Sequence, residues 1–346
     1  MAGRKWKTRK KKRSGCGGLL LGLFLLALVA AGAAGWLLLA PYGPENETFV
    51  EVAPGSSTAL IGRQLEAAGV VRSQFAFDLL RFWKRGKLQA GEYRFDHPAP
   101  LTEVYSRIAR GDVFTTTLTV PEGANIFDIA ERVEQAGFGT RKEFLDAAVQ
   151  RKGLVADLDP GAKSLEGYLF PDTYRFARKT TPAQIAVAMV RRFRAVAGQL
   201  ELKENVHEVV TIASVVERET AVDAERPLVA SVFENRLRQK MPLMTDPAVI
   251  YGLELSGRWR GTIDKSDLAR DTAYNTYLHN GLPPGPIANP GIPSLRAAMH
   301  PAQTDYFYFV AAGTNAQGRS LFSNTLEEHD KQVAEYRHAL RKAGER

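Results

Sequence analysis

The chain has 346 residues, of which 45% are hydrophobic and 24% charged, so it is neither disordered nor collagen-like and is long enough for one large or two ordinary domains. Its formal net charge of +8 comes from the basic tail 1–16, which holds eight Lys or Arg and no acid. Without these eight, Lys and Arg number 38, the same as Asp and Glu, so we expect no nucleic-acid partner for the rest of the chain. The single cysteine, Cys16, excludes an intramolecular disulfide.

An uncharged stretch, 17–40, follows the basic tail. A helix of this length spans a bilayer core, whereas the apolar part of a cleaved signal peptide, the alternative interpretation, is usually about 7 to 15 residues long. The cations before the stretch predict, by the positive-inside rule, that the tail is cytoplasmic and the remainder lies outside. We therefore expect a single-pass membrane protein.

The next region, 45–160, is expected to consist of small strand–helix–helix modules. A strand pattern at 48–52 precedes helical patterns at 57–68 and 73–83. The same order returns 68 residues later, beginning with a strand pattern at 115–120 and with five matched positions. This agreement indicates either a true repeat or the general pattern of amphipathic helices that end in glycine.

The character of the sequence changes at about residue 161. Helical patterns cover 182–197, 203–220 and 224–240, and a proline-rich stretch, a strand pattern and a final helix follow. We expect 161–346 to form a second domain of helices and strands, which makes the fold class of the whole chain α+β.

The helix expected at 203–220 is apolar around more than half its circumference, which predicts that it is central and largely buried. Glu217 continues an apolar column near its end, and a buried, unpaired carboxyl keeps its proton near neutrality, as a general acid requires. Glu219 follows Ile212 and Val215 at the same helical spacings, so periodicity leaves both acids as candidates. The structural alternative is that either acid pairs with Arg218, Arg226 or Arg236.

Polar and amphipathic side chains of the kind that line carbohydrate grooves are frequent after residue 161, because sugar hydroxyls need hydrogen bonds and sugar rings lie on aromatic faces. The candidates for substrate binding are Glu166, Tyr168, Asn235, Thr245, Asp246, Tyr251, Asn275 and Tyr277. His207 and Glu208 begin a zinc-peptidase pattern whose second histidine is missing. With no P-loop and no GxSxG motif either, we expect no metal and no cofactor.

The strings EGYLFPDTY, ASVVERET, SVFENRL, TDPAVIYG, AYNTY and GLPPGPIANPG, in this order, closely resemble the MltG (YceG-like) endolytic murein transglycosylases. The resemblance runs from the anchor to the end of the chain. It implies a bacterial inner-membrane protein with a LysM-like region at 45–160 and a periplasmic YceG-like catalytic domain at 161–346. It also implies that Glu217, the first acid of VVERET, is the catalytic residue. The chain departs from the family pattern at Met244, where a glutamine is expected, which puts one hydrogen bond to the substrate in doubt.

The activity implied by the resemblance is cleavage of MurNAc–GlcNAc bonds within nascent glycan strands of peptidoglycan, which would limit strand length. Glu217 would protonate the glycosidic oxygen and then accept the proton of the muramyl C6 hydroxyl, leaving a 1,6-anhydro end. Peptidoglycan strands are the expected substrate, and peptidoglycan synthases are expected partners. Two alternatives stay open: a hydrolase with Asp246 as its second carboxylate, and a non-catalytic peptidoglycan-binding scaffold in which Glu217 is structural.

Overall fold

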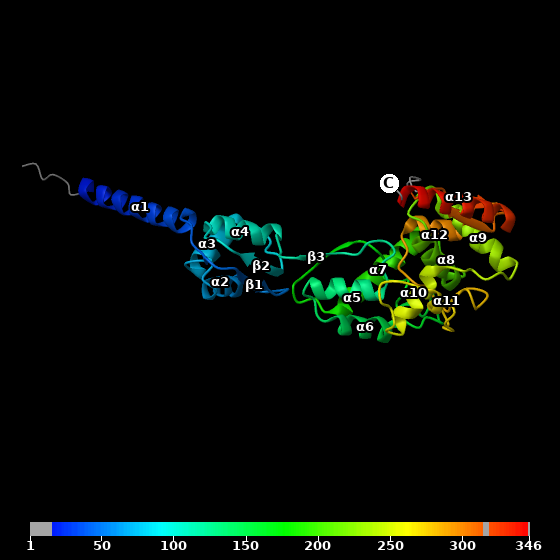
Figure 1. The fold of residues 1–346 in the computed structure, drawn as a ribbon. Helices are drawn as coiled ribbons and strands as arrows, with labels where there is room; N and C mark the ends of the chain where they lie inside the picture. Colours follow the sequence, from blue (N-terminus) through cyan, green and yellow to red (C-terminus); the bar gives the residue numbers. More distant parts are fainter. Residues whose placement is uncertain (1–15, 314–317, 345–346) are drawn as a thin grey trace, which may run out of the picture. The chain divides into compact units, whose positions relative to one another are not determined.

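The protein is described by a computed structural model over residues 16–313 and 318–344, so the basic tail lies, apart from Cys16, outside the described residues. The chain divides into two compact units, Met1–Thr115 and Thr116–Arg346. Both of them contain helices and strands (Figure 1). The fold is therefore a mixture of helices and strands, as the sequence predicts.

The first unit begins with α1 (Cys16–Leu39), which coincides with the uncharged stretch at 17–40. Its segment Leu20–Leu39 has a mean hydropathy of 2.2 and none of it is buried in the fold. Within the described part of the chain it is the one helix long and apolar enough to cross a membrane.

The rest of the first unit is a strand–helix–helix–strand module followed by one more helix. Its elements are β1 (Thr48–Val52), α2 (Thr58–Ala67), α3 (Gln74–Lys84), β2 (Gly91–Phe95) and α4 (Leu101–Arg110). The two strands pair antiparallel, with Thr48 opposite Phe95. Alternate strand residues such as Val50 and Val52 point inward and form one core with the apolar faces of the helices.

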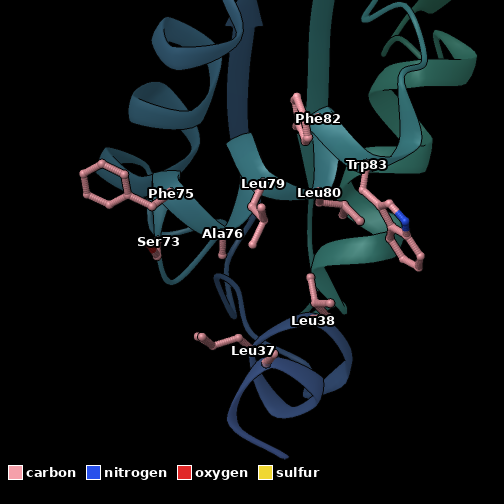
Figure 2. A pocket seen from close by; sticks show the side chains of 10 residues that line it. Leu37, Leu38, Ser73, Phe75, Ala76, Leu79, Leu80, Phe82 and Trp83 are labelled. Atoms are coloured by element: carbon pink, nitrogen blue, oxygen red, sulfur yellow. The ribbon is translucent and has the colours of Figure 1, made fainter. Parts of the chain in front are cut away.

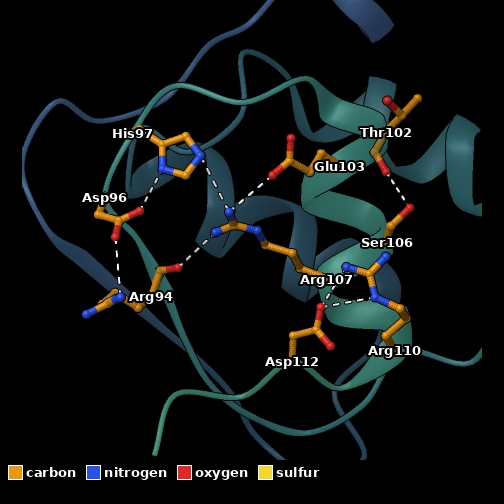
Figure 3. A network of polar contacts seen from close by, with 9 residues as sticks. All are labelled: Arg94, Asp96, His97, Thr102, Glu103, Ser106, Arg107, Arg110 and Asp112. Atoms are coloured by element: carbon orange, nitrogen blue, oxygen red, sulfur yellow. Dashed lines mark hydrogen bonds and ion pairs between the residues drawn. The ribbon is translucent and has the colours of Figure 1, made fainter.

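A polar network on the surface of this unit joins β2 to α4 (Figure 3). Arg107 of α4 donates to the backbone carbonyl of Arg94 at 3.3 Å and pairs with Glu103 at 3.1 Å. Asp96 pairs with Arg94 at 3.4 Å and with His97 at 2.7 Å, and the other ring nitrogen of His97 lies 3.5 Å from Arg107. Since these groups are partly exposed, the network orients the strand against the helix and adds little stability.

The second unit starts with the same order of elements. They are β3 (Thr116–Thr119), α5 (Ile126–Gln135) and α6 (Arg141–Gln150), and β3 pairs antiparallel with β4 (Thr173–Phe176). This matches the element order found 68 residues earlier. The unit begins at Thr116, because β3 takes its partner strand, β4, from later in the chain and shares a core with the later helices.

The remaining elements of the second unit are mostly helices. They are η1 (Lys152–Val155), α7 (Pro182–Gln199), α8 (Val206–Glu219), η2 (Asp223–Glu225), α9 (Arg226–Arg238), α10 (Asp246–Leu255), α11 (Lys265–Leu268), α12 (Ile292–Met299), β5 (Tyr308–Ala311), β6 (Ser320–Ser323) and α13 (Leu326–Gly344). Helix α8 packs against α9, α10 and α12, and α13 packs against the antiparallel pair β5–β6. Two apolar clusters meet on α8, since Val210 and Ala213 belong to one and Val215 and Val216 to the other.

Candidate active site

The two candidate acids lie at the C-terminal end of α8. The helix ends at Glu219, because the next residue, Thr220, is extended. Residues two apart on a helix are separated by about 200° around its axis, so Glu217 and Glu219 face different surroundings. These surroundings distinguish the acids where periodicity did not.

Glu217 is enclosed by hydrogen-bond donors. Its side chain is 5% exposed, and Oε1 accepts a hydrogen bond from Nη1 of Arg226 at 2.8 Å. Oε2 accepts from the backbone N–H of Gly291 at 2.9 Å. Arg226 is held in turn by Asp223 at 3.0 Å and by the hydroxyl of Ser294 at 2.5 Å. The pairing with an arginine that the sequence left open therefore occurs at Glu217.

Another acid, Glu122, approaches this buried pair. Burial, followed by the negative charge of Glu217, raises the pKa of Glu122. A Cβ on Gly291, the residue that supplies the N–H group to Glu217, would lie 1.9 Å from Oε1 of Glu122, so a side chain here would displace the flexible carboxylate of Glu122.

Glu219 lies instead on the wall of a cavity of about 430 Å³. Its side chain is partly buried, and burial raises the pKa of its carboxyl. The hydroxyl of Thr245 opposes this shift, the negative charge of Asp246 adds to it, and the cations Arg236 and Arg218 oppose it. The net result is a carboxyl that holds its proton to a higher pH than an ordinary glutamate, as a general acid must.

The cavity combines polar, charged and aromatic groups from α8 and five further segments. Besides Glu219, its lining residues are Phe233 and Arg236 of α9; Leu243 and Met244 before α10 and Asp246 at its start; Tyr277 of the loop after α11; Tyr308 and Phe309 of β5; and Leu326, His329 and Asp330 of α13. The hydroxyl of Tyr277 donates to Asp246 at 2.7 Å. Burial and the hydrogen bond to Asp246 both raise the pKa of Tyr277. Tyr277 is therefore a neutral hydrogen-bond donor in this wall.

The side chain of Arg236 connects several segments that line this cavity. Its Nε donates to the carbonyl of Phe307 and its Nη1 to the carbonyl of Leu243, both at 2.7 Å. The guanidinium also lies 5.4 Å from the ring centroid of Tyr308. This buried side chain of α9 therefore connects its own helix to the start of β5 and to the loop before α10.

Two amide side chains predicted to bind substrate, Asn235 and Asn275, are buried and bonded within the fold. Asn235 donates to the carbonyls of Thr304 and Tyr306, each at 2.9 Å. Asn275 donates to two carbonyls of the preceding loop at 2.9 and 2.7 Å, and its Oδ1 accepts from the N–H of Tyr277 at 3.0 Å. Both amides shape the chain around the cavity and have no free group in it.

Glu166 is also buried, in a different part of the unit. Its carboxyl accepts from the N–H of Ile126 at 2.9 Å and from the amide of Asn289 at 2.8 Å. Burial raises its pKa to about 8, against the opposing hydrogen bonds from the backbone of Ile126, the hydroxyl of Tyr251 and the backbone of Gly167. Glu166 therefore ties α5 to the proline-rich stretch and does not line the cavity of Glu219.

Three other candidates, Tyr168, Tyr251 and Thr245, are also buried. Tyr168 is fully buried and donates to Asp159 at 2.7 Å, and Tyr251 is 3% exposed with its ring packed edge-on, 5.1 Å from Tyr274. Thr245 is buried beside the cavity. Of the eight residues predicted to bind substrate, the fold brings Asp246 and Tyr277 together with Glu219 on the cavity wall.

The chain is similar to several known proteins. The YceG-like family matches residues 50–335. The chain belongs to the YceG-like family. It is 34% identical over 335 residues to an endolytic murein transglycosylase of Bacillus subtilis strain 168, covering 89% of this chain and 91% of the relative.

A second relative and a solved structure agree with this assignment. An endolytic murein transglycosylase of Streptococcus pneumoniae serotype 2 is 31% identical over 356 residues, which cover 91% of this chain and 64% of the relative. A crystal structure of a yceG-like protein from Listeria monocytogenes is 31% identical, with a TM-score of 0.54, and the match covers 83% of this chain and 99% of that one.

In this YceG-like chain, Met244 lies on the cavity wall and is 50% exposed. Its backbone is left-handed, with φ of 52°, and its N–H donates to the carbonyl of Thr276 at 3.1 Å. A thioether is at best a weak acceptor and donates no hydrogen bond. The position where the sequence analysis expected a glutamine is therefore an apolar part of the wall.

Several lining residues were not among the sequence candidates: Arg236, Tyr308, Phe309, His329 and Asp330. Arg236 stands in SVFENRL, one of the strings that resemble the family, so that string was the available signal for it, and Tyr308 stands in the predicted strand that contains YFYFV. The residues of α13 carry no such signal and reach the cavity only because this helix packs on β5 and β6. Within the described residues, no group of three or more His, Cys, Asp or Glu is arranged to hold a metal ion.

Proposed function

We propose that this chain is a peptidoglycan lytic transglycosylase that cuts MurNAc–GlcNAc bonds within glycan strands, with Glu219 as its acid and base. The family and the names of the two relatives support the reaction class. The observation that carries the assignment of the residue is the carboxyl of Glu219, with its raised pKa, on the wall of a cavity of about 430 Å³. That volume lies in the range of pockets that bind small ligands or a few sugar rings.

The reaction needs one carboxyl in two successive roles. Protonated Glu219 donates its proton to the oxygen that links C1 of MurNAc to GlcNAc, and this bond breaks. The carboxylate then accepts the proton of the muramyl C6 hydroxyl while O6 forms a bond to C1. The products are a 1,6-anhydro-MurNAc end and a free GlcNAc hydroxyl, and no water is consumed.

Glu217, the residue expected from the sequence, stays the alternative acid. Its two oxygens already accept hydrogen bonds from Arg226 and from the N–H of Gly291, and it does not line the cavity of about 430 Å³. This difference in position favours Glu219 for catalysis.

A hydrolase is the second candidate function, because Asp246 supplies another carboxylate to the cavity. A hydrolase would use it as a nucleophile or to activate water. Mass spectrometry of the products of the full chain on uncrosslinked glycan separates the two. We expect anhydro ends and no new reducing ends, both from the wild type and from Asp246→Asn. Reducing ends that disappear in Asp246→Asn would establish the hydrolase, and binding without cleavage would establish a scaffold.

We further propose that α1 anchors the protein in the bacterial inner membrane, with its N-terminus in the cytoplasm and the chain after α1 outside. The eight cations before α1 and the length of its apolar segment support this topology. The strand–helix–helix–strand segments that begin with β1 and β3 would then be LysM-like modules that hold glycan near peptidoglycan synthases. Alkaline phosphatase fused after Arg346 should be active, and activity of only a cytoplasmic reporter at this position would contradict the topology.

A further inference from the structure

Helix α3 exposes a large apolar face. Its exposed apolar side chains are Phe75 (74%), Leu79 (67%), Phe82 (74%) and Trp83 (76%). At about 100° per residue these four fall within an arc of about 100°, apart from the residues that α3 directs into the core, Phe77 and Leu80. Contiguous exposed aromatic and aliphatic groups of this size mark a contact surface.

This face is continuous with the end of α1. Ala34, Leu37 and Leu38 of α1 line one apolar pocket of about 610 Å³ together with Phe75, Leu79, Phe82 and Trp83 of α3 (Figure 2). Leu38 also packs against the core of the first unit. The last turns of the apolar helix and the exposed face of α3 thus form a single apolar surface.

The junction between α1 and the loop before α3 is held by specific contacts. The guanidinium of Arg72 lies 4.3 Å from the ring centroid of Trp36 and 4.6 Å from that of Tyr42. Arg72 also donates to the carbonyl of Pro41 at 3.2 Å, and Tyr42 forms a two-way backbone bridge with Ala99. Because α3 begins two residues after Arg72, it starts at the level where α1 ends.

Basic residues flank the apolar face at its C-terminal end. Lys84, Arg85 and Lys87 are exposed, and Arg81 is partly exposed one turn earlier. Asp78 is the single acid in α3. A short helix that combines exposed Trp and Phe with cations is the pattern of segments that lie in the membrane interface and attract anionic headgroups.

We propose that α3 lies in the interfacial layer of the bilayer that α1 crosses, with Phe75, Leu79, Phe82 and Trp83 among the upper acyl chains and the basic end at anionic headgroups. This inference rests on the proposed function in one respect, that α1 spans the membrane. The continuity of the two apolar surfaces favours lipid over a protein partner, since a bilayer around α1 also meets α3. The first unit then has two attachments to the membrane, which fix its tilt.

Depth-dependent fluorescence quenching on the full chain tests the proposal. In a Cys16→Ser background, single cysteines replace Leu79, Glu66 or Leu28, and each carries an environment-sensitive fluorophore. The proteins are reconstituted in nanodiscs of phosphatidylcholine with about one third phosphatidylglycerol, containing nitroxide lipids labelled near the headgroup or near the bilayer centre. Glu66 is exposed on α2 and is the matched control, and Leu28 lies within α1.

We expect the label at 79 to be quenched by the shallow nitroxide at least about twofold more than the label at 66, and the label at 28 to be quenched by the deep nitroxide. Quenching at 28 with equal quenching at 79 and 66 would overturn the inference and leave the anchor intact. No quenching at 28 would overturn both. A third outcome is a label at 79 that is shielded from water, is not quenched by either nitroxide lipid, and becomes more shielded as the protein concentration rises. This outcome would assign the apolar face of α3 to a contact with a second copy of the chain and would also overturn the inference.

A second variant separates the apolar contact from folding. Phe82→Ser with Trp83→Ser, in the chain labelled at 79, leaves Phe77 and Leu80 in the core, so the first unit should stay folded by circular dichroism. We expect the shallow quenching at 79 to fall by at least about half. Unchanged quenching would mean that these rings do not contact lipid, which contradicts the proposal.

Discussion

The two glutamates at the end of α8 are two residues apart and have opposite surroundings. Both oxygens of Glu217 accept hydrogen bonds, one from Arg226 and one from the N–H of Gly291. Glu219 instead lines a cavity, and the pKa of its carboxyl is raised. Burial alone therefore does not identify a general acid. Both oxygens of Glu217 are used within the fold, whereas the carboxyl of Glu219 lies on a cavity wall, where a substrate can reach it.

The largest effect is expected for Glu219→Gln, which keeps the shape of the side chain but removes the proton. Loss of general acid–base function typically lowers rates by about 10² to 10⁴. We expect a loss of this size in the initial rate of glycan cleavage, followed by chromatography of the soluble products, while glycan binding is retained. Glu234→Gln, an exposed glutamate on α9, is the matched control and should be fully active. A fully active Glu219→Gln would remove this residue from the mechanism.

Glu217→Gln should act on stability more than on chemistry. Because Asp223 and Ser294 still bind Arg226, we expect the free energy of unfolding to fall by about 1 to 3 kcal/mol. Urea unfolding of the full chain in detergent, followed by near-ultraviolet circular dichroism, measures this change. If the variant were as stable as the wild type but inactive, the contrast between the two acids would be reversed.

Periodicity predicted the helix that carries both acids without distinguishing them, and the family resemblance implied Glu217. Helix α8 begins and ends within three residues of its predicted bounds, because its apolar periodicity is strong. The partners that decide the role of Glu217 are nine and 74 residues further along the chain. Periodicity describes one helix and carries no information on such partners, so the two acids looked equivalent.

The same limit explains the predicted substrate residues and the division of the chain. Asn235 and Asn275 are polar types that could bind a sugar, yet their hydrogen bonds go to backbone carbonyls of the fold. The boundary expected at 160 depends on composition, whereas the observed one at Thr115 depends on the pairing of β3 with β4. Local patterns gave the strands and helices, and long-range pairing determined how they are grouped.

Glu166 extends the comparison to a buried acid far from the cavity. Its pKa rises from 4.5 to about 8 in the folded chain, so between these values the folded state holds a proton that the unfolded state has lost. The contribution of Glu166 to stability should therefore be greatest below pH 4.5 and fall by up to about 1.4 kcal/mol per pH unit until about pH 8.

Urea unfolding across this pH range, with wild type and Glu166→Gln in parallel, measures the effect. The variant should show a shallower fall with pH even if it is less stable throughout, because it has no proton to lose at this position. Equal slopes in the two proteins would show that Glu166 does not titrate as its burial requires.

The smallest effect is expected for Tyr277→Phe, which removes the hydroxyl that donates to Asp246. A hydrogen bond of this kind contributes about 0.5 to 1.5 kcal/mol, so we expect KM for glycan to rise about two- to tenfold with kcat little changed. Steady-state kinetics separate the two constants. A large fall in kcat would place Tyr277 among the groups that act in the chemical step.

The most direct test of the account measures anhydro-MurNAc ends released by Glu217→Gln and by Glu219→Gln, at equal concentrations of folded protein and below the unfolding temperature of both. Since the account assigns the proton transfers to Glu219 alone, folded Glu217→Gln should release anhydro ends within about tenfold of the wild-type rate, and Glu219→Gln at most about one hundredth of it. The opposite pattern, with Glu219→Gln active and folded Glu217→Gln inactive, would contradict it and assign the chemistry to Glu217.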